Sequence, residues 1–184
     1  MIRVGILGDI GSGKSYIAKN FGYPVFNADN EVGKLYKKNK KVFNKLQKAL
    51  PKHIFTFPID KKEITRAILA NKANLRKIIK IVHNEIRKKM NIFLRNNRNK
   101  KIVILDIPLL LENKINKKND ILIFVEANQK DTMKRLRQRA NFNLKIFKKF
   151  KKIQLSLDYK KKKSNFIIKN NFSSKSVKKR IEYI

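Results

Sequence analysis

The residues best suited to chemistry lie between Gly8 and Ser15, in the order Gly-Asp-Ile-Gly-Ser-Gly-Lys-Ser. This order fits G-x-x-x-x-G-K-[ST], a pattern that binds nucleoside triphosphates when it follows a strand and opens a helix. Its glycines let backbone N–H groups turn inward to form a nest for anions. We expect Lys14 to reach the β- and γ-phosphates and Ser15 to give its hydroxyl to Mg²⁺. Asp9 is unusual here, because an acidic side chain repels phosphate unless it faces solvent.

Acidic residues follow two of the predicted strands. Asp29, at the end of Asn-Ala-Asp, is a candidate base for the proton of an acceptor hydroxyl. Asp106 is a candidate second carboxylate for Mg²⁺, and Glu112 is expected on the substrate side. Simpler interpretations stay open, because Asp29 also suits a helix cap and Asp106 also suits an Asp-x-Pro turn.

Cationic side chains in predicted helices are further candidates. Arg135 and Arg139 are four residues apart, so we expect them on one helical face, where guanidinium groups clamp phosphates and neutralise transition-state charge. A solvated helix face is the alternative. His83 lies in a helical pattern, where a lone histidine is more often structural than catalytic.

The elements that must position these residues alternate between strands and helices. Apolar, β-branched runs predict strands at 2–7, 24–26, 102–105, 121–125 and 166–168. Helical patterns cover 15–21, 64–95 and 129–139. The alternation predicts an α/β fold with a parallel sheet. The 75 residues between Phe26 and Ile102 exceed one crossover, so we expect an inserted helical lobe at 30–99. A shorter insertion at about 140–152, rich in Lys and Phe, is a candidate lid.

Composition narrows the function classes. The 184 residues, 42% of them hydrophobic, suffice for a folded core. Lys and Arg number 47 against 13 Asp and Glu, a net charge of +34, which suits polyanionic partners. The charge is spread along the whole chain, which favours a composition bias over a dedicated nucleic-acid surface. The absence of Cys excludes disulfides and thiolate metal sites. No apolar run approaches a spanning helix of ~20 residues, and the first residues suit a strand better than a signal peptide, so we expect a soluble, cytoplasmic protein.

In this order and spacing, the motifs resemble the dephospho-coenzyme A kinase family, from residue 2 to about residue 170. The family's opening, G-L-T-G-G-I-G-S-G-K-S, is similar to residues 5–15. Its D-A-D, H-P-x-I-R, D-x-P-L-L-x-E, R-L-x-x-R and I-x-N signatures fall on 27–29, 83–87, 106–112, 135–139 and 168–170. Three positions depart from it: Asp9 replaces a glycine, Asn27 an aspartate and Asn84 a proline.

The resemblance implies a P-loop NTPase fold, with a five-stranded parallel sheet flanked by helices. The nucleotide-binding core would comprise 1–29 and 100–184, including the lid, and 30–99 would bind coenzyme A. The implied activity is transfer of the ATP γ-phosphate to the ribose 3′-hydroxyl of dephospho-coenzyme A, with Mg²⁺, as the last step of coenzyme A biosynthesis.

The resemblance also implies roles for particular residues. Those expected in catalysis are Asp29, Lys14 and Arg139. Those expected at ATP are Gly8, Gly11, Ser12, Gly13, Lys14, Ser15, Arg135, Arg139 and Asn170. Those expected at the acceptor are Asp29, His83, Arg87, Leu109 and Glu112. Those expected at the metal are Ser15 and Asp106.

Two other functions stay open at this point. One is a P-loop kinase of another small molecule, such as a nucleotide or a shikimate-like acceptor; the long lobe with His83 and Arg87 suits a bulkier acceptor. The other is a P-loop protein that binds nucleic acid through its charge, but the chain has no recognised RNA-binding motif and no Trp. We therefore expect dephospho-coenzyme A as partner, no specific nucleic acid, no membrane, and a monomer or small homo-oligomer.

Overall fold

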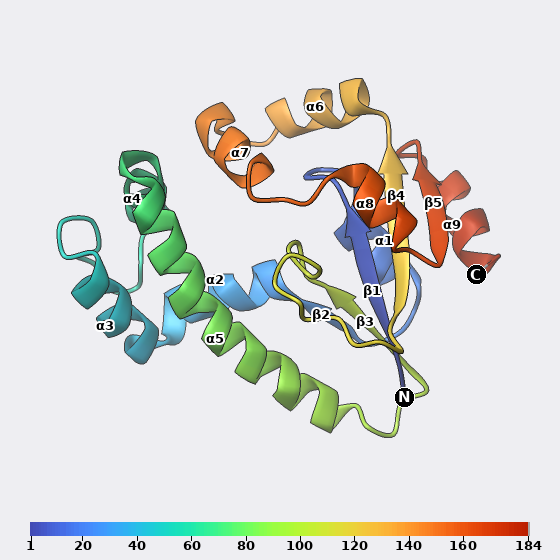
Figure 1. Cartoon of the computed structure of the whole chain (residues 1–184), viewed down its shortest axis with the longest axis horizontal. Coiled ribbons are helices and arrows are strands. Elements are labelled where there is room, and N and C mark those ends of the chain that lie inside the picture. Colours follow the sequence, from blue (N-terminus) through green and yellow to red (C-terminus); the bar gives the residue numbers. More distant parts are fainter. Residues whose placement is uncertain (184) are drawn as a thin grey trace. The chain divides into compact units, whose positions relative to one another are not determined.

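A five-stranded parallel sheet is the main feature of the fold in the computed structural model of the protein, which describes residues 1–183 (Figure 1). Its strands are β1 (Ile2–Gly8), β2 (Val25–Asn27), β3 (Ile102–Asp106), β4 (Ile121–Ala127) and β5 (Phe166–Asn170). Their order is β2-β3-β1-β4-β5, and every pairing is parallel. The five predicted strands and the parallel α/β fold are confirmed.

The helices lie between these strands along the chain, except α9, which follows β5. Their bounds are α1 (Lys14–Asn20), α2 (Ala28–Lys38), α3 (Lys40–Ala49), α4 (Lys61–Ala70), α5 (Lys72–Asn96), α6 (Gln129–Arg137), α7 (Leu144–Lys151), α8 (Leu157–Lys162) and α9 (Ser174–Glu182). The helical pattern at 64–95 belongs to two helices, because Asn71 is extended and ends α4. The Asn71 side chain then accepts a hydrogen bond from the Ala73 amide, at 2.8 Å, as α5 begins.

The buried core explains why the sequences of the central strands are nearly continuous runs of apolar residues. In a parallel sheet both faces are covered, so most side chains of a central strand are buried. On one face, α1 and α9 pack against the sheet and contribute Ile17 and Val177 to a cluster with Ile6 of β1. On the other face, Leu110 and Leu122 lie over Gly5. The sheet therefore holds the carboxyl ends of β1, β2 and β3 in fixed register.

The chain divides into two compact units: residues 1–27 with 96–184, and residues 28–95. The second unit consists of α2, α3, α4 and nearly all of α5, which buries apolar residues three or four apart: Leu75, Ile78, Val82, Ile86 and Met90. Buried Glu63 of α4 accepts hydrogen bonds from the amides of Phe55 and Thr56, which ties the preceding loop to the helix. Within residues 1–183, none of the helices combines the length and apolar character needed to cross a membrane.

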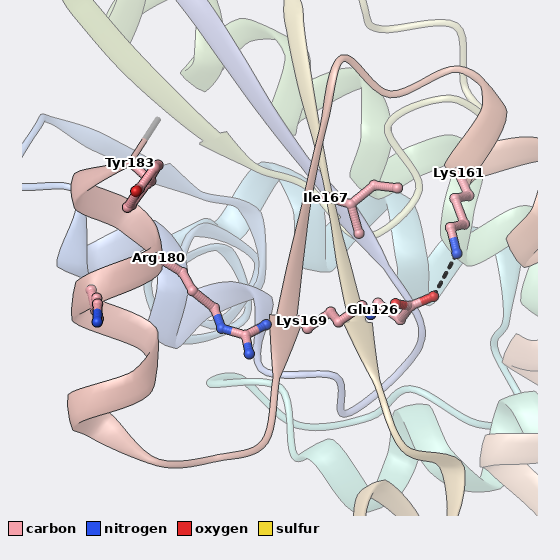
Figure 2. Close-up of a pocket in the computed structure, with 7 residues that line it drawn as sticks. Glu126, Lys161, Ile167, Lys169, Arg180 and Tyr183 are labelled. Carbon is pink, nitrogen blue, oxygen red and sulfur yellow. Dashed lines mark hydrogen bonds and ion pairs between the residues drawn. The ribbon is translucent and has the colours of Figure 1, made fainter.

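A hollow of about 630 Å³ lies beside the edge strand β5 (Figure 2). Its charged lining comes mostly from lysine and arginine, and its one acidic residue, Glu126, pairs with Lys161 at 2.7 Å. The hydrogen bond from Lys161 lowers the pKa of Glu126. None of the residues that line the hollow belongs to the predicted site; they are Glu126, Lys161, Ile167, Lys169, Lys179, Arg180 and Tyr183.

Candidate active site

The loop at residues 8–15 joins β1 to α1, which is the strand-to-helix context that its sequence pattern requires. Gly13 has φ 91°, a left-handed conformation that side chains disfavour. A Cβ there would also lie 2.3 Å from Nδ2 of Asn170. Gly11 has φ 81°, and a Cβ on it would lie 2.8 Å from the side chain of Leu136. The two glycines are therefore needed for both the turn and the close packing around it.

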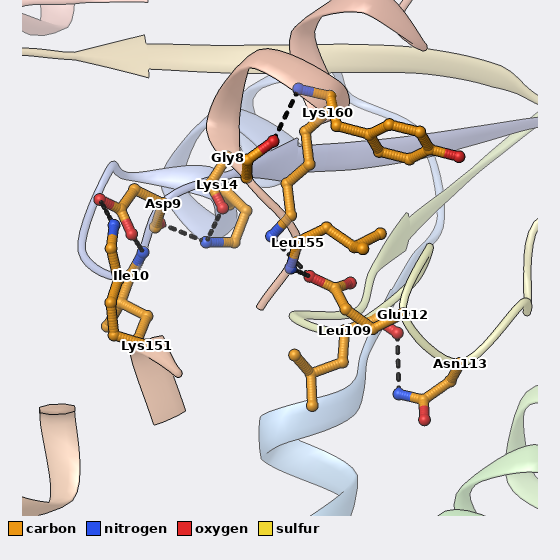
Figure 3. A network of polar contacts seen from close by, with 12 residues as sticks. Gly8, Asp9, Ile10, Lys14, Leu109, Glu112, Asn113, Lys151, Leu155 and Lys160 are labelled. Carbon is orange, nitrogen blue, oxygen red and sulfur yellow. Dashed lines mark hydrogen bonds and ion pairs between the residues drawn. The ribbon is translucent and has the colours of Figure 1, made fainter. Parts of the chain in front are cut away.

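Lys14 is buried at the start of α1, and its ammonium group lies against the loop. Nζ donates to the carbonyl oxygen of Asp9, at 2.6 Å, and to that of Gly8, at 3.3 Å (Figure 3). A lysine in this position carries its positive charge within the loop itself. That placement suits a charge that stabilises bound phosphate.

Ser15, at the start of α1, lies close to Asn27, which together with Asp106 ends a strand of the sheet. Asn27 and Asp106 are partners in the β2–β3 register. The Asn27 amide donates to Oδ2 of buried Asp106 and, at 3.4 Å, to Oγ of Ser15. Asn27 therefore connects the Ser15 hydroxyl and the Asp106 carboxylate through a neutral amide group. A carboxylate at position 27 would instead repel Asp106.

This cluster fits a hard divalent cation. A hydroxyl and a carboxylate are oxygen ligands of the kind that Mg²⁺ takes, together with water and substrate phosphates. Within residues 1–183, no group of three or more His, Cys, Asp or Glu side chains is arranged to hold a metal by itself. The donor set thus suits a cation that arrives with a phosphate ligand.

Asp9 is engaged within the loop and with α7. Its Oδ1 accepts a hydrogen bond from the Ile10 amide at 2.7 Å, and its Oδ2 lies 2.5 Å from Nζ of Lys151 (Figure 3). The acidic residue that is unusual in a phosphate-binding loop is therefore paired with a cation. Sequence reasoning did not find Lys151, because the two residues are 142 positions apart.

Asn170, at the end of β5, supports the loop from the other side. Its Nδ2 donates to the carbonyl oxygen of Ser12 at 2.8 Å, and its Oδ1 accepts from the Phe172 amide at 2.8 Å. The Arg135 guanidinium lies over the Phe172 ring, 4.6 Å from its centroid, which is cation–π geometry. These contacts place Arg135 and Asn170 in one cluster around the P-loop.

Arg139 differs from expectation. The sequence predicts a helix to residue 139 with Arg135 and Arg139 on one face, but α6 ends at Arg137 and Gln138 is its cap. The Arg139 amide bonds to the carbonyl of Leu136, three residues back, so the last turn tightens and the helix stops. The shared helical face is therefore wrong, and Arg139 lies in the turn between α6 and α7.

Glu112 and Leu109 lie in the turns after β3. Oε1 of Glu112 is 2.8 Å from Nζ of Lys160, which is 1% exposed, and accepts from the Leu155 amide at 3.0 Å. Figure 3 shows these two donors meeting at the one carboxylate. The Leu109 carbonyl accepts two hydrogen bonds from Asn113. Glu112 thus connects this turn to α8 and the residues before it, a contact that sequence reasoning missed.

The remaining predicted residues lie in the second unit. Asp29 is exposed in the first turn of α2, two positions after β2 ends, where an acidic side chain also complements the helix dipole. His83 and Arg87 are four residues apart on α5, so their side chains share one side of the helix.

The sequence model of the dephospho-CoA kinase family matches residues 2–176. The chain belongs to this family. A dephospho-CoA kinase from Wolbachia pipientis wMel is 31% identical over an alignment of 179 positions that covers 95% of this chain and 91% of the relative. One from Wolbachia sp. subsp. Brugia malayi is 32% identical over an alignment of 186 positions that covers 98% of this chain and 95% of the relative.

A solved structure extends the likeness to the fold. The dephospho-CoA kinase from Campylobacter jejuni has a TM-score of 0.64 with this chain, at 22% identity, and covers 98% of this chain and 94% of its own. Membership of the dephospho-CoA kinase family and the P-loop kinase fold, both predicted, are therefore confirmed. The departures at Asp9 and Asn27 fall on residues that the structure connects, through Lys151 and Asp106, to other side chains of the site.

Proposed function

We propose that this dephospho-CoA kinase uses ATP to phosphorylate the ribose 3′-hydroxyl of dephospho-coenzyme A, with Asp29 as the base. Membership of the family, matched over residues 2–176, supports the activity and the acceptor. The observation that carries the proposal is the glycine loop between β1 and α1, with the Lys14 ammonium group held in it. A loop of this kind has one well-understood use, which is to hold the phosphates of a nucleotide.

The phosphates would be held by the loop backbone and by Lys14, with further charge from Arg135 and Arg139. Ser15 and Asp106 would hold Mg²⁺, which, when bound, neutralises charge on the β- and γ-phosphates. Asn27 would keep the Ser15 hydroxyl and the Asp106 carboxylate in place through its two hydrogen bonds. Catalysis would then depend mostly on position and charge, as is usual in phosphoryl transfer.

Asp29 would accept the proton of the attacking hydroxyl. Chain connectivity supports this role, because Asp29 follows the end of β2 by two residues and β2 pairs with β3, whose last residue is Asp106. Within the unit formed by residues 28–95, Asp29, His83 and Arg87 would bind the acceptor. The lid at about 140–152 would exclude water, which otherwise competes as acceptor.

Composition and family membership also support three coarser proposals. The enzyme would act in the cytoplasm, as a monomer or small homo-oligomer. Its substrates would be small molecules, with no specific nucleic acid and no membrane as partner.

A direct assay would follow phosphorylation of dephospho-coenzyme A by the purified chain with ATP and Mg²⁺, against shikimate and a nucleoside monophosphate as acceptors. We expect Asp29→Asn to lower kcat by about 10²- to 10⁴-fold, because a general base contributes about that much. The KM for ATP should change less than about threefold, since Asp29 is assigned to the acceptor.

The matched control is Asp60→Asn in the same unit. Asp60 caps α4 by accepting a hydrogen bond from the Lys62 amide at 2.8 Å, and asparagine caps about as well. Its activity should equal that of the wild type. No turnover of dephospho-coenzyme A, or an Asp29→Asn variant as active as the wild type, would refute the proposal.

A further inference from the structure

The P-loop of this chain contains a fixed negative charge. Asp9 cannot turn its carboxylate away without losing the hydrogen bond from the Ile10 amide, at 2.7 Å, and only 19% of its side chain is exposed. The carboxylate therefore belongs to the same loop that must accept a triphosphate. Like charges this close oppose binding unless a cation compensates them.

Lys14 is poorly suited to compensate Asp9. Its ammonium group bonds to the backbone carbonyls of Gly8 and Asp9, at 3.3 and 2.6 Å, and it is the cation assigned to the phosphates. A second cation is needed if the loop is to present a positive field.

Lys151 supplies that second cation. Its Nζ lies 2.5 Å from Oδ2 of Asp9, so the two opposite charges form an ion pair. It comes from the last turn of α7, a helix that buries none of its residues. Packing of α7 into a core therefore does not explain why Lys151 reaches the loop. After α7 the chain returns to Glu112 through the Leu155 amide, so the segment is attached on both sides of Lys14 (Figure 3).

We propose that Lys151 is a positioning residue of the nucleotide site, which neutralises Asp9 and so allows the loop to accept ATP. The inference rests on the proposed function, because it needs a triphosphate in the loop. Asp9 stands where the family pattern has glycine, and this inference explains how the loop tolerates the acidic side chain: Lys151 of α7 pairs with it. Lys151 acts on the nucleotide through Asp9.

The decisive experiment is a double-mutant cycle of Lys151→Gln and Asp9→Asn, read by calorimetric titration with a non-hydrolysable ATP analogue. Lys151→Gln should weaken binding about tenfold, because it leaves the carboxylate uncompensated. Asp9→Asn keeps an oxygen for the Ile10 amide but removes the charge, so adding it to Lys151→Gln should restore binding to within about threefold of the wild type. In turnover, Lys151→Gln should raise the KM for ATP by the same factor and leave kcat within about twofold.

Two further variants isolate the charge at this position. Lys151→Arg should keep binding within about threefold, since a guanidinium also pairs with a carboxylate. Lys148→Gln, an exposed lysine one turn earlier on α7, should bind as the wild type does. The loss caused by Lys151→Gln should shrink at high salt, because 39% of the Lys151 side chain is exposed to solvent.

The outcomes separate this inference from the function on which it rests. If Lys151→Gln binds the analogue as tightly as the wild type, or if Asp9→Asn fails to rescue it, the inference is wrong. Failure to rescue would mean that Lys151 contacts the phosphates itself or only holds α7. If the cycle behaves as expected while dephospho-coenzyme A is not phosphorylated, the charge compensation stands and the proposed acceptor is wrong.

Discussion

The P-loop and the segment from α7 to α8 are neighbours in one unit, but they are held in place by different means. The loop is positioned by backbone: β1 in the centre of the sheet, left-handed glycines, and the β2–β3 register that brings Asn27 to Asp106. The α7–α8 segment is attached by side-chain charges at Lys151 and at Lys160, and α8 also contacts β1. The P-loop is thus fixed by the backbone of the sheet. The α7–α8 segment is attached to it through side-chain contacts, each of which a single substitution can remove.

The two ion pairs of that segment also differ from each other. Lys160 is 1% exposed, so its pairing with Glu112 compensates a charge that has lost its water. Lys151 keeps 39% of its side chain in solvent. The Lys160–Glu112 pair therefore contributes mainly to stability, whereas the Lys151–Asp9 pair is placed to affect ligand binding.

The most severe test of the backbone-built region is Lys14→Ala. We expect turnover to fall at least ~10³-fold, because this lysine is the cation within the loop. The fold should remain intact, since strand register and glycine conformations set the loop. The measurements are steady-state kinetics and far-UV circular dichroism. Lys19→Ala, an exposed lysine in the last turn of the same helix, is the control and should retain activity. Retained activity in Lys14→Ala would contradict the assignment of Lys14 as the cation on which the loop depends.

Glu112→Gln tests the buried charge pair of the other region. It leaves the Lys160 ammonium group without a compensating charge, so we expect the free energy of unfolding to fall by about 3 kcal/mol. Urea denaturation measures this. Combining it with Lys160→Met should recover most of the loss, because replacing both partners removes the buried charge as well.

The control for this pair lies one residue along α8. Lys161 pairs with Glu126 at 2.7 Å, but both side chains are over one-third exposed. Glu126→Gln should therefore cost less than about 1 kcal/mol. Equal losses for Glu112→Gln and Glu126→Gln would show that burial does not distinguish the two pairs.

The backbone-built region is also the one that sequence predicts best. The five strands follow from β-branched runs, and residues 8–15 form one uninterrupted motif, so local chemistry suffices. Asn27 and Asp106 come together because parallel strands end at the same edge of a sheet, and α1, which follows β1, brings Ser15 to Asn27. Two of the three predicted helical ranges differ from the structure at an end or a break: α6 stops before Arg139, and Asn71 divides the helical pattern at 64–95.

The side-chain-built region could not be predicted in the same way. Lys151 and Asp9 are 142 positions apart, and the chain contains 47 Lys and Arg from which to choose a partner for one acid. Nothing local distinguishes Lys151 from Lys148 or Lys149, nor Lys160 from Lys161. The choice depends on tertiary packing, which brings Lys151 to Asp9 and buries Lys160 against Glu112.

A smaller test compares two helix caps of the same residue type. Asn128 caps α6 by accepting from the Lys130 amide at 2.9 Å, and Asn143 caps α7 by accepting from the Ile146 amide at 3.0 Å. Helix α6 buries Thr132 and Leu136, whereas α7 buries none of its residues. Asn128→Ala should therefore lower the global free energy of unfolding by about 1 kcal/mol, the usual cost of a lost cap.

Asn143→Ala should change the global value by less than about 0.3 kcal/mol, because α7 can unfold without opening the core. Its effect should be local, a roughly fivefold faster amide hydrogen exchange confined to residues 144–151, with β1 and β4 unchanged. If Asn143→Ala instead lowers global stability as much as Asn128→Ala does, α7 is coupled to the sheet. The distinction between a backbone-built site and a charge-attached segment would then have to be given up.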